Sequence, residues 1–258
     1  MTRVVTVANQ AGSVGKSTLV VSLAGLLAGQ GQRVLVADLD AQANATKWLG
    51  VDPATTKVYS GDVLLRRGEA LDAVVPSAVD GVLVMPGRED LAADLVALQN
   101  EAAAVLRLRK PLAEVVSEHG VDVVLLDCPG SMTLVTWCAL AASTSAVTVT
   151  TPAQKEIDGI GPFQQTVTQV ADELDVPVSL AAIVPCMVPP ANAGRVYAEA
   201  LAWLRGQFGA LVTPPVRRAA VVAEAASHWE PVTTYAPDEP VSLDLAAVLA
   251  NLQARGVV

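Results

Sequence analysis

Six short runs of almost uninterrupted apolar residues set the architecture of this 258-residue chain. The runs are RVVTVA (3–8), RVLVADL (33–39), GVLVMP (81–86), VDVVLLD (121–127), SAVTVTT (145–151) and VSLAAIV (178–184). A strand that is buried on one face alternates apolar and polar residues, whereas a strand covered on both faces is apolar throughout. The runs therefore predict strands of a mostly parallel sheet that lies between two layers of helices.

Helical patterns separate these strands. Apolar residues recur at helical spacing in roughly 16–29, 90–118, 132–142, 158–174, 192–208, 219–227 and 241–254. Strands that alternate with helices form a doubly wound α/β sheet with right-handed crossovers, and ligands of such sheets bind beyond the carboxyl ends of the strands. With 52% hydrophobic residues for a core, we expect one α/β domain over residues 1–258. The less patterned segment 50–80, where short helices fit, gives no reason for a boundary.

Composition argues against several other classes of protein. The apolar runs are too short for membrane spans, and the N-terminus lacks the layout of a signal peptide. Three scattered cysteines, Cys128, Cys138 and Cys186, without a C-x-x-C pair disfavour a disulfide framework or a zinc site and suit a reducing cytoplasm. Seventeen basic against 26 acidic residues give a net charge of -9, so nucleic-acid binding needs a local basic patch.

The segment AGSVGKST (11–18) lies between the first predicted strand and the first predicted helix, which is the setting of a phosphate-binding loop. Backbone N–H groups of residues 12–17 can converge on phosphate oxygens where the helix dipole favours anions. Lys16 would reach the β- and γ-phosphates, Ser17 would supply a hydroxyl to Mg²⁺, and Thr18 could contact the α-phosphate. The expected nucleotide ligands are Gly12, Ser13, Val14, Gly15, Lys16, Ser17 and Thr18. The alternative is a glycine turn before a helix with an exposed lysine.

Aspartates at the ends of two other predicted strands argue against that alternative. Asp127 ends VLLD, where a carboxylate can hold Mg²⁺ through water, although a solvated strand-end aspartate is also possible. Asp38 and Asp40 lie at the end of the second strand, two residues apart, and would share a face of an extended segment. Because the carboxyl ends of parallel strands meet at one edge, we expect these groups to border the same site as the loop.

In this order the motifs resemble those of the ParA/MinD family of P-loop NTPases with a deviant Walker A loop, most of all small ParA/Soj-type partition ATPases. The family's loop K-G-G-x-G-K-[ST] corresponds to AGSVGKS (11–17). Its motifs D-x-D-P-Q-x-N and D-x-P-P correspond to DLDAQAN (38–44) and DCPG (127–130). TPAQKEIDGI (151–160) and VAEAASHWEPVTTYAPDEP (222–240) resemble its V-P-x-Q-P-E and S-E-A-P-S-H-G-K-P-V stretches, so the resemblance spans nearly the whole chain.

The resemblance implies a cycle that positions a cargo, such as a plasmid or chromosome. Family members bind ATP and Mg²⁺, close into a face-to-face homodimer and coat the nucleoid through non-specific DNA contacts. A ParB-like or cargo-adaptor protein stimulates their slow hydrolysis and releases them, so the γ-phosphate acts as a switch. In this chain Lys16 would be catalytic and Asp40 would orient or activate the attacking water. Ser17, Asp40 and, through water, Asp127 would hold the metal.

The chain departs from the family at the first lysine of the loop, which in relatives crosses to the partner's phosphates. Ala11 replaces it, and a methyl group carries no charge to stabilise phosphoryl oxygens. Lys155 is the only lysine in residues 111–258 and stands where the family usually has proline. A subset that resembles the carboxysome-distributing, McdA-like ATPases lacks the loop lysine and is thought to use one from this later region. We expect Lys155 to take this catalytic role; an ordinary solvated lysine is the alternative.

A second departure is Ser13, which stands where the family has glycine. A serine there is somewhat strained if the loop needs a positive φ at this position. If it does not, the hydroxyl can add a phosphate contact.

Four arginines of the C-terminal region are the candidates for DNA contacts: Arg195, Arg205, Arg217 and Arg218. The resemblance places DNA contacts in this part of the dimer, where doubling can produce a phosphate-binding stripe. The alternative is that they only solubilise helix surfaces, and Val221 stands where relatives often have arginine. We favour a cytoplasmic, nucleoid-associated protein without an added operator-binding domain. We expect no membrane binding, because SLDLAAVLANLQARGVV (242–258) carries too little charge for an amphipathic anchor.

Three other functions stay open. The cargo could be a protein organelle, or Ala11 could mark a nucleotide-dependent scaffold that hydrolyses poorly or not at all. An iron–sulfur carrier of the same fold needs bridging cysteines, and Cys128 and Cys138 do not form the expected pattern. The tryptophans are expected to pack in the protein and not to stack on bases; they are Trp48, Trp137, Trp203 and Trp229.

Overall fold

All six apolar runs form strands in the computed structural model, which describes residues 2–10 and 12–258. The strands are β1 (Arg3–Ala8), β2 (Val34–Asp38), β4 (Val82–Met85), β5 (Val123–Asp127), β6 (Ser145–Thr150) and β7 (Leu180–Pro185). They lie in one sheet of order β3-β4-β2-β5-β1-β6-β7, in which only the two-residue strand β3 (Val75–Pro76) is antiparallel to its neighbour. The predicted doubly wound α/β sheet is therefore confirmed, while β3 was not predicted.

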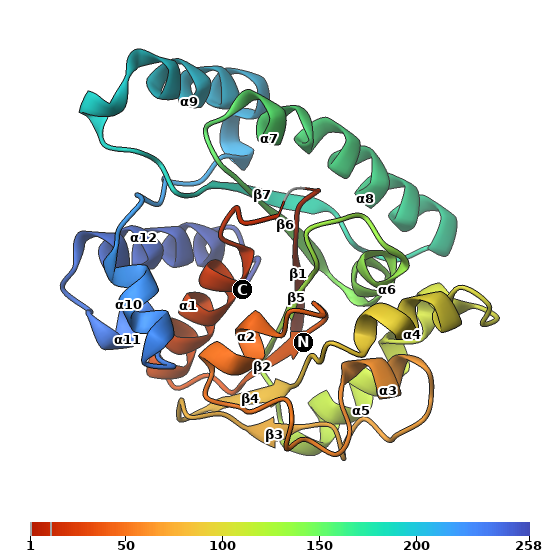
Figure 1. The fold of residues 1–258 in the computed structure, drawn as a ribbon. Coiled ribbons are helices and arrows are strands. Elements are labelled where there is room, and N and C mark those ends of the chain that lie inside the picture. Colours follow the sequence, from red (N-terminus) through yellow and green to blue (C-terminus); the bar gives the residue numbers. More distant parts are fainter. Residues whose placement is uncertain (1, 11) are drawn as a thin grey trace.

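Two layers of helices cover the sheet, as Figure 1 shows. The first layer consists of α1 (Lys16–Gly29), α2 (Asn44–Trp48), α10 (Val221–Ser227), α11 (Val232–Tyr235) and α12 (Pro240–Ala254). The second consists of α3 (Ser60–Leu64), α4 (Leu91–Leu98), α5 (Arg109–His119), α6 (Leu134–Ala142) and α8 (Ile160–Leu174). Helices α7 (Gln154–Asp158) and α9 (Arg195–Phe208) pack near the β7 edge, and short 3-10 turns lie at Ala104–Leu106, Ala191–Ala193 and Gly209–Leu211.

Successive strand residues enter opposite cores, which explains the uninterrupted apolar runs. Val34 and Val36 pack in the first layer, whereas Leu35 and Ala37 pack in the second. All four side chains are fully buried. A polar residue at either set of positions would lose its contact with water, so both faces of the strand are apolar.

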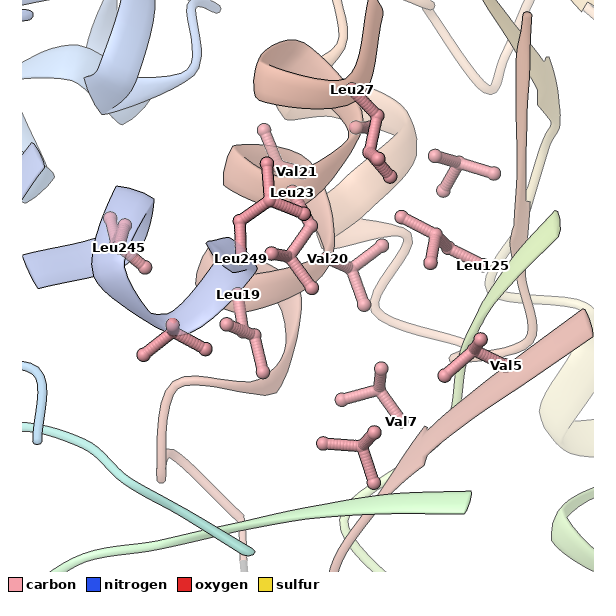
Figure 2. Close-up of a cluster of buried hydrophobic side chains, with 14 of the residues drawn as sticks. Val5, Val7, Leu19, Val20, Val21, Leu23, Leu27, Leu125, Leu245 and Leu249 are labelled. Atoms are coloured by element: carbon pink, nitrogen blue, oxygen red, sulfur yellow. The ribbon is translucent and has the colours of Figure 1, made fainter. Parts of the chain in front are cut away.

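Helix α1 is apolar on nearly every side because other elements surround it. Leu19, Val20 and Leu23 are fully buried, and Figure 2 shows them among side chains of β1, β5 and α12, including Val5 and Leu249. Each such side chain contributes roughly 1.5–3 kcal/mol when it is buried. This packing fixes the N-terminus of α1, and the loop before it, at the carboxyl edge of the sheet.

The prediction of one continuous helix over 90–118 is wrong. Helix α4 ends at Leu98, Ala103 adopts a left-handed conformation with φ 52°, and α5 begins only at Arg109. The break falls in a stretch that contains no glycine or proline, and its one stop signal is Asn100, directly after the C-cap residue Gln99. The described residues form no helix that is both long and apolar enough to span a membrane.

Candidate functional site

The loop between β1 and α1 has an unusual backbone conformation. Ser13 has φ 58° and Gly15 has φ 99°, so the backbone turns through the left-handed region twice. The backbone strain expected for Ser13 if its φ were positive is therefore present, and it costs about 1 kcal/mol relative to glycine. Ala11, which replaces the first lysine of the family's loop, lies outside the described residues.

The N-terminus of α1 is open toward the loop. Its first turn contains no acidic residue, and no side chain caps it. The first N–H groups and the positive end of the dipole are therefore available to an external anion. Among the described residues, a Cβ on Gly12 would meet no atom within 4 Å, so the space beside Gly12 is open as well.

A cavity of about 810 Å³ lies over this loop, which is ample for a nucleotide. The loop contributes Gly12, Ser13, Gly15, Lys16, Ser17 and Thr18 to its lining. The other walls are Asp40, Gln42, Asn44, Lys47, Trp48, Pro129, Gly130, Ser131, Met187, Ala226 and Trp229. The motifs after β1, β2 and β5 thus meet at one cavity, as predicted from the parallel sheet. Val14 is buried, so its backbone is the part that can face a phosphate.

Asp127 is the most unusual group at this edge. It is fully buried, it lies level with Val7 of β1 and Asp38 of β2, and neither carboxylate oxygen has a well-formed hydrogen bond within the described residues. Burial raises the pKa of Asp127 well above its ordinary value and the Asp38 carboxylate raises it further, while the nearby Ser17 hydroxyl and Lys16 ammonium act in the opposite direction. A buried carboxylate without well-formed hydrogen bonds costs several kcal/mol, so this position favours a cation.

Asp38 has a different role from Asp40, although the sequence placed the two together. Its Oδ2 accepts hydrogen bonds from the Thr46 backbone N–H (2.8 Å) and hydroxyl (2.7 Å), and its Oδ1 accepts one from the Asp40 N–H (3.1 Å). Burial raises the pKa of Asp38 to about 6, and these hydrogen bonds oppose the rise. Asp38 therefore positions the segment that presents Asp40 to the cavity.

The backbone after β4 completes this arrangement. The Gly87 N–H donates to the Thr46 hydroxyl oxygen (2.9 Å). A Cβ on Gly87 would lie 2.8 Å from the Asp40 carbonyl oxygen and 3.0 Å from Cγ of Asp38, so only glycine allows this approach. Asp40 itself is half-buried, and its Oδ1 accepts the Gln42 N–H (3.0 Å).

The oxygen atoms at this edge suit a hard cation such as Mg²⁺. Ser17 offers a hydroxyl, and Asp127 and Asp40 offer carboxylates, which are the donors that Mg²⁺ prefers. Within the described residues no group of three or more His, Cys, Asp or Glu side chains could hold a metal alone. This set therefore fits an ion that completes its shell with water and phosphate oxygens, as Mg²⁺ commonly does.

Lys155 lies at the same edge of the sheet but is not among the residues that line the cavity. It is exposed on α7, which follows the carboxyl end of β6. A Cβ on Gly159, directly after α7, would lie 3.9 Å from Cβ of Gln10 and 4.0 Å from the Lys155 carbonyl oxygen. Helix α7 therefore borders the segment that leads into the loop, next in sequence to Ala11.

The four candidate arginines are all exposed, but two of them are paired with carboxylates. Arg217 donates to both carboxylate oxygens of Asp244 at 2.6 and 2.9 Å, and Arg195 contacts Glu199 at 3.1 Å. Arg205 lies on α9, and Arg218 follows Arg217 beside the C-terminal helix layer. The pairing lowers the net positive charge that these positions can offer to DNA.

Two of the four tryptophans are about half-exposed, although Trp203 packs edge-on against Phe208, with the ring centroids 6.5 Å apart. Trp203 is 47% exposed and Trp229 is 50% exposed, and Trp229 lines the cavity. Trp48 is buried and also lines it, and its Nε1–H donates to the Glu230 carbonyl oxygen (2.6 Å). Sequence reasoning missed these cavity residues; a possible signal was the tryptophan of SHWEP at the position of the family's glycine.

Comparison with known proteins agrees with this geometry. A family model described as an AAA domain matches residues 2–180. The chromosome-partitioning ATPase Soj of Thermus thermophilus is 34% identical over 239 residues, which are 92% of this chain and 90% of that protein. Cobyrinic acid a,c-diamide synthase of Mycobacterium smegmatis, solved with an ATP analogue and magnesium, is 30% identical with a TM-score of 0.77, covering 89% of this chain and 91% of that one.

The fold is also that of McdA. A Cyanothece McdA variant in complex with ATP is 19% identical, with a TM-score of 0.87 over 98% of this chain and 96% of that one. The matched sequence relatives and the arrangement of the loop at the carboxyl edge of the sheet point to the same conclusion. The chain belongs to the ParA/MinD family of P-loop ATPases.

Proposed function

We propose that this protein is a ParA-like ATPase that binds ATP and Mg²⁺, dimerises with ATP and positions a cargo such as a plasmid or chromosome. The observation that carries the proposal is Asp127, whose carboxylate is fully buried without a well-formed hydrogen bond among the described residues, beside an open N-terminus of α1. An arrangement that is costly by itself is explained if a cation and a phosphate anion normally complete it.

In this proposal, different residues contact the phosphates, the metal ion and the attacking water. The N–H groups of residues 12–17 and the Lys16 ammonium would hold the phosphates, while Thr18 would contact the α-phosphate. Ser17 and Asp127 would hold Mg²⁺, which neutralises charge that develops on the phosphate oxygens. Asp40, held in place by Asp38 and Thr46, would orient the attacking water.

Lys155 supplies a cation across the dimer in this proposal. We expect Lys155→Ala to lower ATP turnover by about 100-fold, because a positive charge near the transferred phosphoryl group has effects of this size. The affinity of the monomer for ADP should change less than about 3-fold, because Lys155 does not line its own cavity. Phosphate release and calorimetric titration measure the two effects.

Two further variants sharpen this test. Lys57→Ala removes another exposed lysine and should turn over ATP like the wild type. Ala11→Lys should restore part of the turnover of Lys155→Ala if both lysines reach the same phosphates. Wild-type turnover in Lys155→Ala would reject the substitution, and low turnover in the wild type, with ATP-dependent dimers, would favour a scaffold.

We further propose that the ATP-bound dimer binds DNA without sequence preference and that a partner protein stimulates hydrolysis. Arg218→Glu should weaken ATP-dependent DNA binding. The slope of log K against log salt concentration should fall in magnitude by about one for each arginine removed. Arg109→Glu on α5 makes the same charge change elsewhere and is the control. Fluorescence anisotropy against salt measures both, and equal DNA binding with ADP and ATP would contradict the proposal.

A further inference from the structure

Helix α10 ends in a turn that requires a left-handed residue, and that residue is a tryptophan. The Glu230 N–H donates to the Ala225 carbonyl oxygen (3.2 Å), and the Trp229 N–H donates to that of Ala226 (3.3 Å). This is the Schellman pattern, whose left-handed position is usually glycine. Trp229 occupies it with φ 58°, which is strained for a bulky side chain.

The turn is held on both sides of Trp229. The Trp48 indole N–H donates to the Glu230 carbonyl oxygen (2.6 Å). Pro231 packs so closely against α1 that a Cβ on Gly25 would lie 3.2 Å from its ring. The surrounding contacts therefore over-determine a conformation that Trp229 itself disfavours.

Burial of the indole does not explain why a tryptophan stands there. The side chain is 50% exposed and lines the cavity over the phosphate loop. Met187 and Ala226 share the lining, and both also line an adjoining, mostly apolar cavity of about 530 Å³ with Cys186 and Val216. The cavity over the loop therefore carries an exposed aromatic group and adjoins an apolar cavity through Met187 and Ala226.

We propose that Trp229 stacks on the base of the bound nucleotide. The inference rests on the proposed nucleotide function of the cavity and adds a contact for the half of the ligand that the loop does not hold. Every base offers a flat π face, so such a contact contributes affinity with little discrimination between bases. A strained residue with an exposed side chain beside a ligand cavity is expected where that side chain contacts the ligand.

The test compares nucleotide with tripolyphosphate, which has no base. We expect Trp229→Ala to bind MgADP about 10- to 100-fold more weakly than the wild type in calorimetric titrations, and Trp229→Phe to stay within about 5-fold. Tripolyphosphate should bind all three proteins equally, because the phosphate loop is unchanged. Equal MgADP affinity in Trp229→Ala, or an equal loss of tripolyphosphate binding, would overturn the inference.

A glycine at this position separates ligand contact from packing. Trp229→Gly removes the indole and also relieves the left-handed strain. We expect its melting temperature without ligand to equal or exceed that of the wild type, with MgADP binding as weak as in Trp229→Ala. A lower melting temperature indicates a packing role, and loss of ATP-dependent dimers alone indicates a subunit contact; either would overturn the inference. If the wild type binds no nucleotide, the proposed function itself fails.

Discussion

Lys16→Ala is expected to lower ATP turnover by more than about 100-fold. The ammonium group lies at the start of α1, is almost fully buried, and acts electrostatically on Asp127. This ammonium group can stabilise the negative charge on the transferred phosphoryl group in the transition state. Preorganised charges of this kind lower the activation free energy by about 3–4 kcal/mol. Phosphate release under saturating ATP is the measurement.

A second lysine of the same cavity provides the matched control for Lys16→Ala. Lys47 also lines the cavity, but its Nζ donates to the Gln42 carbonyl oxygen (2.9 Å) on the exposed side. Lys47→Ala makes the same chemical change and should keep turnover within about 5-fold. If Lys16→Ala retained wild-type turnover, the loop would not be the phosphate site.

Asp127→Asn is expected to act in opposite directions on the free protein and on its complex. Because burial and Asp38 together outweigh Lys16 and Ser17, the pKa of Asp127 is raised and its charged form is disfavoured in the fold. Neutralising it should stabilise the ligand-free protein by about 1–3 kcal/mol. The variant should then lose the additional stabilisation that MgATP gives, since its site for the ion is gone.

The pH dependence follows from the same shift. The folded-state pKa of Asp127 lies above the unfolded value, so the cost of its charge is fully present above the folded pKa and disappears below the unfolded pKa. The stability advantage of Asp127→Asn over the wild type should therefore shrink as the pH falls. Asp80→Asn, at an exposed position, should show neither effect. Denaturant unfolding with and without MgATP measures both, and a less stable free variant would contradict the account.

The sheet could be predicted because each strand meets two cores. Because both faces of a strand are buried, its residues form a continuous apolar run, as in VVLLD of β5. Six of the seven strands have such a run. Strand β3 has two residues and no pattern to detect. The break between α4 and α5 contains no glycine or proline, and Ala104 packs in the core there. The helical periodicity on both sides of the break therefore predicted one helix.

Part of the site could also be predicted, because a phosphate loop and its strand-end aspartates lie in short contiguous motifs. The role of Asp38 could not, since it depends on hydrogen bonds to Thr46 and, through Thr46, on Gly87, which is 41 residues further along the chain. The exposure and strain of Trp229 depend on how α10 ends against α1 and α2. Such properties arise only when distant segments meet.

In the proposed cycle, the γ-phosphate of ATP stabilises the association of two subunits. The most direct measurement is the molar mass in solution by light scattering, with MgADP and with a slowly hydrolysed MgATP analogue. We expect the mass of one 26.6 kDa chain with MgADP and twice that mass with the analogue. The same mass with both nucleotides would contradict it.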